Sequence, residues 1–553
     1  MSQMNSRRNF LIGSASILAA APSVPLLATS LAKPIRAADT SKRPGQSGAI
    51  SASTPEAAVA GAYVLRRGGN AVDAAIAAFM VQTVREPGNT GLGGYGGSMI
   101  LYQSATRRTH AIDFDSRTPL AFRPELYKTE KDHIHGYLAI GVPGNAAGFD
   151  LALREFGTLS WNEASAHAVD LAEHGLTVDE SHARAFARAA AEMDPVSARA
   201  YFPTGVPSAG QTFKQTDLAK LYRRLGNEGP RTFYSGDVAS RIVRQVQANG
   251  GILSEQDLRL YEATAVEPLR INYRGFEVTT PAPPAAGLTV LSILKTLEQF
   301  DLKKLAPWSA EYFDLFLQAS RHTWAERAQY FGDPDFVNIP VQGLLSEDAA
   351  VRRAEAIRAR KAPPALADNH PGPQHTCNVI SIDGDHNVAS ITATHGDDFG
   401  SRVVIDGLGL VLGHGLSRFN WNPPNPNYPA PGKRVYHNMC PVIIYRDGRP
   451  FATLGLPGGQ MIVSVTAQLV VSLLDFHATP EQAVKAPRVH VTGNEPVLLS
   501  QLAPNGIAEA LTSKGYTVRT GRVGGFANAA IIDPESGALS AATDAGPDGA
   551  ATL

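Results

Sequence analysis

The first strong pattern of apolar residues along the chain is helical. Between residues 57 and 84, Ala, Val, Leu and Ile recur at the spacing of one helix face, and only the Arg-Gly-Gly-Asn stretch at 67–70 interrupts them. The interruption predicts two helices joined by a glycine turn. A glycine-rich segment at 91–98 then precedes the apolar residues 99–102. Because glycine allows backbones to approach closely, this segment predicts a loop that runs into a strand.

The middle of the chain is mostly helical, and its last third changes to short strands. Helical spacing continues from 161 to 346, apart from a strand-like run at 276–279, and a proline-broken loop covers 361–373. Beyond the loop, short apolar runs are separated by turn residues and predict strands at 378–382, 387–393, 402–405, 442–445 and 451–454. The pattern predicts a mixed α/β (α+β) fold with a sheet-rich C-terminal part.

The N-terminus resembles an export signal. Arg7 and Arg8 follow a short polar start, and a stretch rich in Ala, Leu and Ser comes after them. Pro22 and Pro25 interrupt this stretch, which argues against a membrane anchor. We therefore predict a twin-arginine signal peptide over 1–37 and a periplasmic or extracellular protein, without membrane contact once the signal is removed.

Composition excludes several classes of partner. The chain of 553 residues is 44% hydrophobic and 18% charged, which is typical of a globular protein. Its formal net charge of −1 gives no general attraction to nucleic acid, so we expect a small-molecule amide or peptide substrate. The two cysteines, Cys377 and Cys440, lack the spacing of a metal site and are interpreted as small buried side chains. We expect neither a cofactor nor a metal ion.

Thr376 lies where the proline-broken loop meets the first strand of the C-terminal part. If the peptide bond before it were cut, the threonine would offer its hydroxyl as a nucleophile and its new α-amine as a base. A free α-amine has a pKa of about 7.7 to 8.0, so it can accept a proton at neutral pH. From the residue type alone, an ordinary strand threonine is the simpler interpretation.

Ordered sequence blocks favour the nucleophile. Before the proline-broken loop, five blocks resemble those of the gamma-glutamyltransferase family, namely 67–75, 91–99, 142–145, 249–251 and 331–336. Three more follow in the family's order at 431–434, 457–459 and 486–488. The resemblance implies an N-terminal-nucleophile hydrolase with a four-layer alpha-beta-beta-alpha sandwich built from two self-processed chains. It implies a large subunit at 38–375 that pairs as a heterodimer with a small catalytic subunit at 376–553.

The same resemblance implies roles for four residues. Counting back from the shared Asp383 places Thr376 on the family's nucleophile. Thr394 matches a threonine whose hydroxyl supports that nucleophile. Gly458 and Gly459 match the pair whose backbone amides form an oxyanion hole, where small residues let two N–H groups face one developing charge. A tight turn is the alternative interpretation of the two glycines, and both can hold together.

The substrate pocket departs from the family's pattern. Asp115 stands where an arginine normally holds the donor's α-carboxylate, and Arg117 follows two residues on. Arg418 replaces the acid that holds the α-amine, and His437 and Asn438 replace paired serines. We interpret these five as candidate substrate-binding residues. Arg418 has two interpretations, because it could bind an acid group of the substrate or pair with Asp115.

Three functions remain in view. The first is a self-processing N-terminal-threonine amidohydrolase or acyltransferase that acts on gamma-glutamyl amides such as glutathione through a Thr-acyl intermediate. The second is an acylase of the cephalosporin type or for other acidic side chains. The third is a silent periplasmic homologue that binds a ligand without turnover, and the presence of Thr376, Thr394 and the two glycines argues against it.

Overall fold

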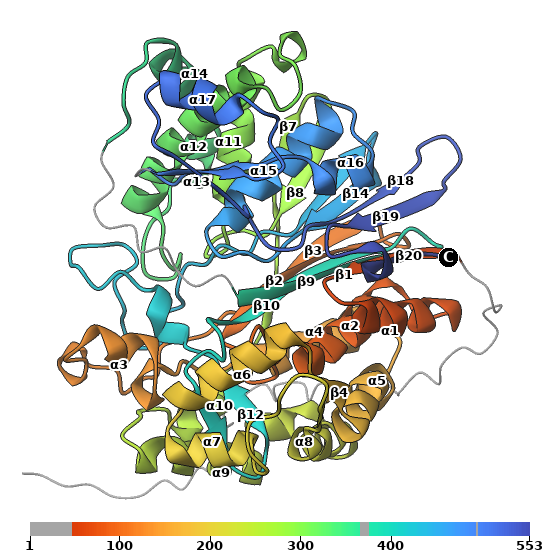
Figure 1. The fold of residues 1–553 in the computed structure, drawn as a ribbon, viewed down its shortest axis with the longest axis vertical. Coiled ribbons are helices and arrows are strands. Elements are labelled where there is room, and N and C mark those ends of the chain that lie inside the picture. Colours follow the sequence, from red (N-terminus) through yellow and green to blue (C-terminus); the bar gives the residue numbers. More distant parts are fainter. Residues whose placement is uncertain (1–46, 365–374, 494–495) are drawn as a thin grey trace, which may run out of the picture. The chain divides into compact units, whose positions relative to one another are not determined.

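Two antiparallel sheets lie face to face at the centre of the protein (Figure 1). The computed structural model describes residues 47–364, 375–493 and 496–553, so the predicted signal peptide at 1–37 lies outside the described residues. The first sheet has seven strands in the order β20 (Ala550–Thr552), β1 (Gly48–Ala52), β9 (His375–Asp383), β10 (Val388–Gly396), β2 (Gly96–Gln103), β3 (Arg108–Asp113) and β6 (Thr264–Val266). The second has six, in the order β19 (Leu539–Thr543), β18 (Asn528–Ile532), β14 (Arg449–Gly455), β13 (Val442–Arg446), β8 (Phe276–Thr280) and β7 (Leu269–Tyr273).

Alternation along the strands decides which side chains enter the space between the sheets. Successive residues of a strand point to opposite faces. In β9, Ile380 and Ile382 pack between the sheets against Ile443 of β13, whereas Cys377 and Val379 pack against the helices on the other face. The even-numbered residues of β9, Thr376 among them, therefore face the interior of the sandwich.

Helices cover the outer face of the seven-stranded sheet (Figure 1). The covering helices are α1 (Pro55–Arg66), α2 (Ala71–Arg85), α4 (Asn145–Phe156) and α5 (Trp161–His174). Asn70 and Asp73 form a capping box at the start of α2, and residues 71–84 of that helix are all buried. Further helices extend this side of the sheet: α3 (Glu130–Ile134), α6 (Glu180–Glu192), α7 (Pro195–Tyr201), α8 (Thr216–Glu228), α9 (Gly236–Ala248) and α10 (Glu255–Leu260).

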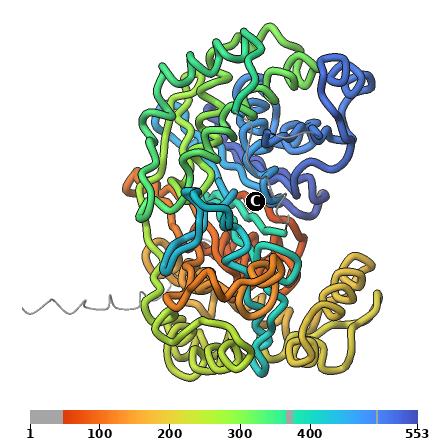
Figure 2. Tube along the Cα trace, turned by 90° about the vertical axis from the view of Figure 1, so that its left-hand side faces the viewer, coloured from red at the N-terminus to blue at the C-terminus, as the bar shows by residue number. Residues whose placement is uncertain are grey.

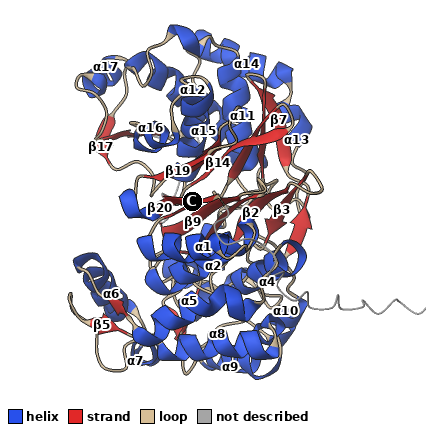
Figure 3. Ribbon diagram, turned by 90° about the vertical axis from the view of Figure 1, so that its right-hand side faces the viewer, coloured by secondary structure: helices blue, strands red, loops and turns tan. Residues whose placement is uncertain are grey.

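A second helical layer covers the six-stranded sheet (Figure 3). Its main members are α11 (Gly287–Glu298), α12 (Ala310–Tyr330) and α15 (Met461–Leu474), and all of α15 is buried. Smaller elements surround it: α13 (Val341–Leu345), α14 (Glu347–Arg358), α16 (Pro480–Lys485), α17 (Ile507–Ser513), β15 (Val489–His490), β16 (Val497–Ser500) and β17 (Val518–Gly521). Two strand pairs, β4 (Leu176–Thr177) with β5 (Thr212–Phe213) and β11 (Val403–Ile405) with β12 (Leu410–Leu412), complete the fold. The layers confirm the predicted alpha-beta-beta-alpha sandwich.

Both halves of the sequence contribute to both sheets. In the seven-stranded sheet, β10 lies between β9 and β2, so a strand from the first half of the chain pairs with one from the second. Figure 2 shows this mixing as orange N-terminal segments beside teal and cyan segments from the later part of the chain. Among the described residues, no helix is long and apolar enough to cross a membrane.

The predicted helix pair, the strand at 276–279 and the five C-terminal strands are confirmed, with small shifts at their ends. The strand after the glycine loop begins at Gly96 rather than at residue 99. Gly96 and Gly97 already pair with Thr394 and Ala393 of β10, so the last glycines of the loop belong to the sheet. A Cβ atom on Gly97 would lie 2.3 Å from the carbonyl oxygen of Thr392, which explains why glycine is needed there.

Candidate active site

Thr376 lies near the beginning of β9, faces the space between the sheets and is buried. Its hydroxyl oxygen is 3.4 Å from that of Thr394 on the neighbouring strand. The pairing of β9 with β10 is irregular here, because Ala393 faces Cys377 whereas Gly396 faces His375. Gly396 takes a φ of 99°, a conformation that glycine adopts without strain. The resulting bulge turns the Thr394 side chain toward the first residues of β9.

Thr394 binds three groups through one hydroxyl. It donates a hydrogen bond to the carbonyl oxygen of His375. It accepts one from the backbone N–H of Gly396 at 2.6 Å and one from the Thr376 hydroxyl at 3.4 Å. The carbonyl of the peptide bond between His375 and Thr376 is therefore polarised by a buried donor, directly beside a potential nucleophile.

Gly458 and Gly459 lie between the end of β14 and the start of α15. Both have positive φ, 136° and 59°, and their carbonyl oxygens accept hydrogen bonds from the first amides of α15. A Cβ atom on Gly458 would be 2.8 Å from the backbone nitrogen of Gly525. The tight turn expected for this pair is therefore present. The start of a helix also carries a partial positive charge, which suits a developing oxyanion.

The end of β14 reaches the side of the sheet on which Thr376 lies. A Cβ atom on Gly455, the last residue of β14, would be 2.3 Å from the side chain of Asn378. Asn378 stands two residues after Thr376 and points to the same face of β9. The segment from Gly455 to Gly459 therefore begins beside the strand that carries the nucleophile candidate.

Asp115 follows the end of β3 and is buried, and its two carboxylate oxygens have no hydrogen-bond partner among the described residues. Burial raises the pKa of its carboxyl group well above the usual value, and the charge of nearby Asp113 raises it further. Nε2 of His437 lies 4.0 Å from Asp115 Oδ2. Burial, together with repulsion from Arg327 and Arg434, lowers the pKa of His437 to about 3. Both the carboxyl and the imidazole therefore favour their neutral forms.

Arg418 lies in a short 3₁₀ turn (Gly415–Arg418) and donates a hydrogen bond of 2.8 Å to the carbonyl oxygen of Gly396. Burial raises the pKa of the neighbouring Tyr95 hydroxyl, and Arg418, which hydrogen bonds to that hydroxyl, opposes the increase. The interpretation in which Arg418 pairs with Asp115 is wrong, because both carboxylate oxygens of Asp115 lack a hydrogen-bond donor among the described residues. The guanidinium lies instead beside the residue that bonds Thr394.

The remaining two candidates have structural contacts of their own. Arg117 donates a long hydrogen bond of 3.4 Å to the carbonyl oxygen of Gly432 and lines a cavity of about 360 Å³ together with His437. The side-chain oxygen of Asn438 accepts a hydrogen bond of 3.0 Å from Arg327, which is fully buried. Neither contact joins these residues directly to Thr376.

Two groups near the site were not predicted. Arg434 makes ion pairs with Asp113 at 2.5 Å, Asp333 at 2.6 Å and Asp335 at 2.8 Å. The blocks 331–336 and 431–434 contained three of these residues, but the sequence did not indicate that they meet. Asn89, which bonds His375, was also missed.

The two cysteines are buried, as predicted, and both are free. Burial raises the pKa of both thiols, so neither is an activated nucleophile. Among the described residues, no group of three His, Cys, Asp or Glu side chains could hold a metal ion.

Comparison with known proteins identifies the family. The gamma-glutamyltranspeptidase family profile matches residues 57–553. A glutathione hydrolase proenzyme of Bacillus subtilis is 31% identical, over 97% of this chain and 96% of that protein. The acylase ACY 1 proenzyme of a Pseudomonas strain is 33% identical, over 89% of this chain and 91% of that protein. The crystal structure of a cephalosporin acylase from Bacillus halodurans superposes with a TM-score of 0.83 at 26% identity, over 92% of this chain and 96% of that one. The chain belongs to the gamma-glutamyltranspeptidase family of N-terminal-nucleophile hydrolases.

Proposed function

We propose that the chain cuts itself before Thr376 and then uses Thr376 as the nucleophile of an amidohydrolase. In the first step the Thr376 hydroxyl oxygen attacks the carbonyl carbon of His375, and Thr394 stabilises the charge that develops on the carbonyl oxygen. The C–N bond breaks as an ester bond to Thr376 forms, and the nitrogen takes up the hydroxyl proton. Water then hydrolyses the ester, which leaves a carboxylate on His375 and a free α-amine on Thr376.

In the second reaction the free α-amine accepts the proton of the Thr376 hydroxyl, whose oxygen attacks the carbonyl carbon of a donor amide. The backbone amides of Gly458 and Gly459 hold the oxyanion. The leaving amine departs with a proton, and the acyl group remains on Thr376 as an ester. Water completes hydrolysis, whereas an incoming amine completes transfer.

The polarised bond between His375 and Thr376 is the observation that carries this proposal. An ordinary strand threonine has no need of a neighbour that donates to the preceding carbonyl group, yet Thr394 does so while it also contacts the Thr376 hydroxyl. The pieces 38–375 and 376–553 would stay together as a heterodimer, because they share both sheets. The predicted signal peptide would deliver the protein to the periplasm or outside the cell.

Gamma-glutamyl amides such as glutathione are the first candidate donors, since relatives are named glutathione hydrolases. The pocket favours a donor with an acid group. Asp115 and His437 prefer their neutral forms, whereas an arginine stays charged, so Arg418 offers a positive charge beside Gly396 that an acid group of the donor could meet. A glutaryl amide, which has a terminal carboxylate but no amine, would then compete well with the glutamyl donor. Because one relative is named an acylase, we include this second class of donor in the test.

Purified protein separated on a denaturing gel tests the proposal. The expected result is two bands, with a smaller fragment that starts at Thr376 by N-terminal sequencing. Turnover is then measured separately on gamma-glutamyl, glutaryl and neutral acyl anilides. A single uncut chain that turns over donors, or a fragment with another N-terminus, would refute the assignment, and a single uncut chain without turnover would favour the silent homologue.

A further inference from the structure

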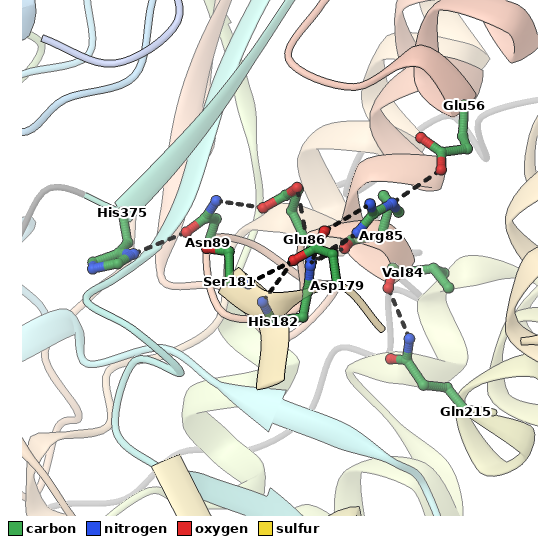
Figure 4. A network of polar contacts seen from close by, with 10 residues as sticks. All are labelled: Glu56, Val84, Arg85, Glu86, Asn89, Asp179, Ser181, His182, Gln215 and His375. Carbon is green, nitrogen blue, oxygen red and sulfur yellow. Dashed lines mark hydrogen bonds and ion pairs between the residues drawn. The ribbon is translucent and has the colours of Figure 1, made fainter. Parts of the chain in front are cut away.

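His375, the residue before the proposed cut, is anchored by its side chain as well as its carbonyl group. Its ring nitrogen Nδ1 is 2.9 Å from the side-chain oxygen of Asn89 (Figure 4). The other ring nitrogen lies 3.9 Å from Asp397 Oδ1. The carbonyl oxygen of the same residue accepts the hydrogen bond from Thr394. The acyl half of the bond is therefore held by two hydrogen bonds, one to the side chain of His375 and one to its carbonyl group.

Asn89 contacts both the strand that carries Thr394 and the side chain of His375, the first through its backbone and the second through its side chain. Its carbonyl oxygen accepts a hydrogen bond of 2.9 Å from the backbone N–H of His395, the residue directly after Thr394. Its side-chain nitrogen donates to Glu86 Oε2 at 2.9 Å, so its side-chain oxygen must accept from His375. The same residue thus holds the strand that carries Thr394 and the ring of the residue that Thr394 polarises.

Glu86 is itself held by the helical layer. Its carbonyl oxygen accepts the backbone N–H of Asn89 at 2.9 Å, and its side chain lies 4.0 Å from Nε2 of His182. Arg85, the preceding residue, contacts Glu56 at 3.0 Å and the ring of His182 at 2.8 Å (Figure 4). Asn89 is therefore attached to the end of α2 and not to a free loop, so its side chain is a fixed acceptor.

We infer that His375 is a positioning residue for self-cleavage, and that Asn89 holds its imidazole so that the carbonyl carbon faces the Thr376 hydroxyl. The inference rests on the proposed cut before Thr376. Attack requires a fixed orientation of the Thr376 hydroxyl relative to the His375 carbonyl group, and free rotation of His375 would disturb that orientation. After the cut, His375 is only the end of the large piece, so its side chain has no further part in turnover of donors.

The test measures how fast purified precursor converts into two chains. His375→Ala and Asn89→Leu should each slow conversion roughly tenfold, the scale of one lost positioning hydrogen bond. The double variant should be no slower than the slower single variant, because both changes remove the same contact. His375→Asn, whose amide N–H can stand where Nδ1 stands, should recover most of the rate. His174→Ala, a change at an exposed histidine at the end of α5, should leave the rate unchanged.

A second readout separates positioning from damage to the fold. Mature enzyme collected from His375→Ala after complete conversion should have the kcat and KM of the wild type. Conversion at the wild-type rate in both His375→Ala and Asn89→Leu would overturn the inference, as would a parallel loss of kcat in mature His375→Ala. A small fragment that starts elsewhere than Thr376 would instead overturn the proposed function itself.

Discussion

Replacing Thr394 with valine tests the centre of the proposed mechanism, because valine keeps the branched shape and removes only the hydroxyl. The structure gives that hydroxyl three partners: the His375 carbonyl group, the Gly396 N–H and the Thr376 hydroxyl. Loss of a donor to a developing oxyanion slows reactions by about 100- to 1,000-fold. The Gly396 N–H also loses its acceptor, which costs about 1–3 kcal/mol of stability if no other group replaces it.

Both effects can be measured on the same preparations. The ratio of uncut to cut chain is followed on gels after purification, and thermal unfolding of Thr394→Val precursor is compared with that of Thr376→Ala precursor. Thr394→Ser keeps a hydroxyl and should slow cutting less than tenfold, because only its rotamer is freer. If the valine variant cut itself at the wild-type rate, the polarised carbonyl would have no role and the proposed mechanism would be wrong.

Three further predictions concern the nucleophile and the pocket. Thr376→Ala should abolish both cutting and turnover. Cys377→Ala should leave both largely intact, because Cys377 packs toward the helices. Retained cutting in Thr376→Ala would count against the mechanism. Arg418→Ala should raise KM for acidic anilides by roughly 10- to 150-fold, the equivalent of about 1.5–3 kcal/mol for a charged hydrogen bond, and should leave neutral anilides unaffected. An equal loss for both donors would show that Arg418 is structural. The folded-state pKa of Asp115 is raised, so its contribution to stability is lost as pH rises above the unfolded pKa of about 3.9. Asp115→Asn should therefore gain thermal stability relative to wild type as pH rises from about 4 to about 7. A difference in thermal stability that does not change with pH would refute this reasoning.

The elements were predictable where local pattern and packing agree. The helices α1 and α2 are apolar at helical spacing and end at a glycine turn, and both signals are local. The C-terminal strands are short, apolar and bounded by turn residues, which is again local. The strand β1 was missed because Gly48–Ala52 is a short, small-residue segment that becomes a strand only through its partners β9 and β20.

The site was predictable only as far as the family's blocks reach. Thr376, Thr394 and the glycine pair came from those blocks, and the geometry adds the polarised carbonyl group between the two threonines. Asn89 could not be predicted, because 286 residues separate it from His375. The partner of Arg418 was missed for a related reason. A charged side chain in a sequence suggests an opposite charge, whereas here the bulge at Gly396 turns a backbone carbonyl group toward it.

The strand order of the seven-stranded sheet requires that folding precede cutting. Strands from the two sides of residue 376 are interleaved, because β1 lies between β20 and β9 and β2 lies beside β10, so neither piece holds a complete sheet by itself. Folding must therefore be finished while the chain is continuous, and cutting comes afterwards. Unfolding of the cut protein would release two separate chains, each with unpaired strand edges that invite aggregation. Reassembly would become bimolecular, so recovery from denaturant should fall on dilution for the cut protein and stay independent of concentration for Thr376→Ala. The cut would thus turn a reversible fold into one preserved mainly by the height of its unfolding barrier.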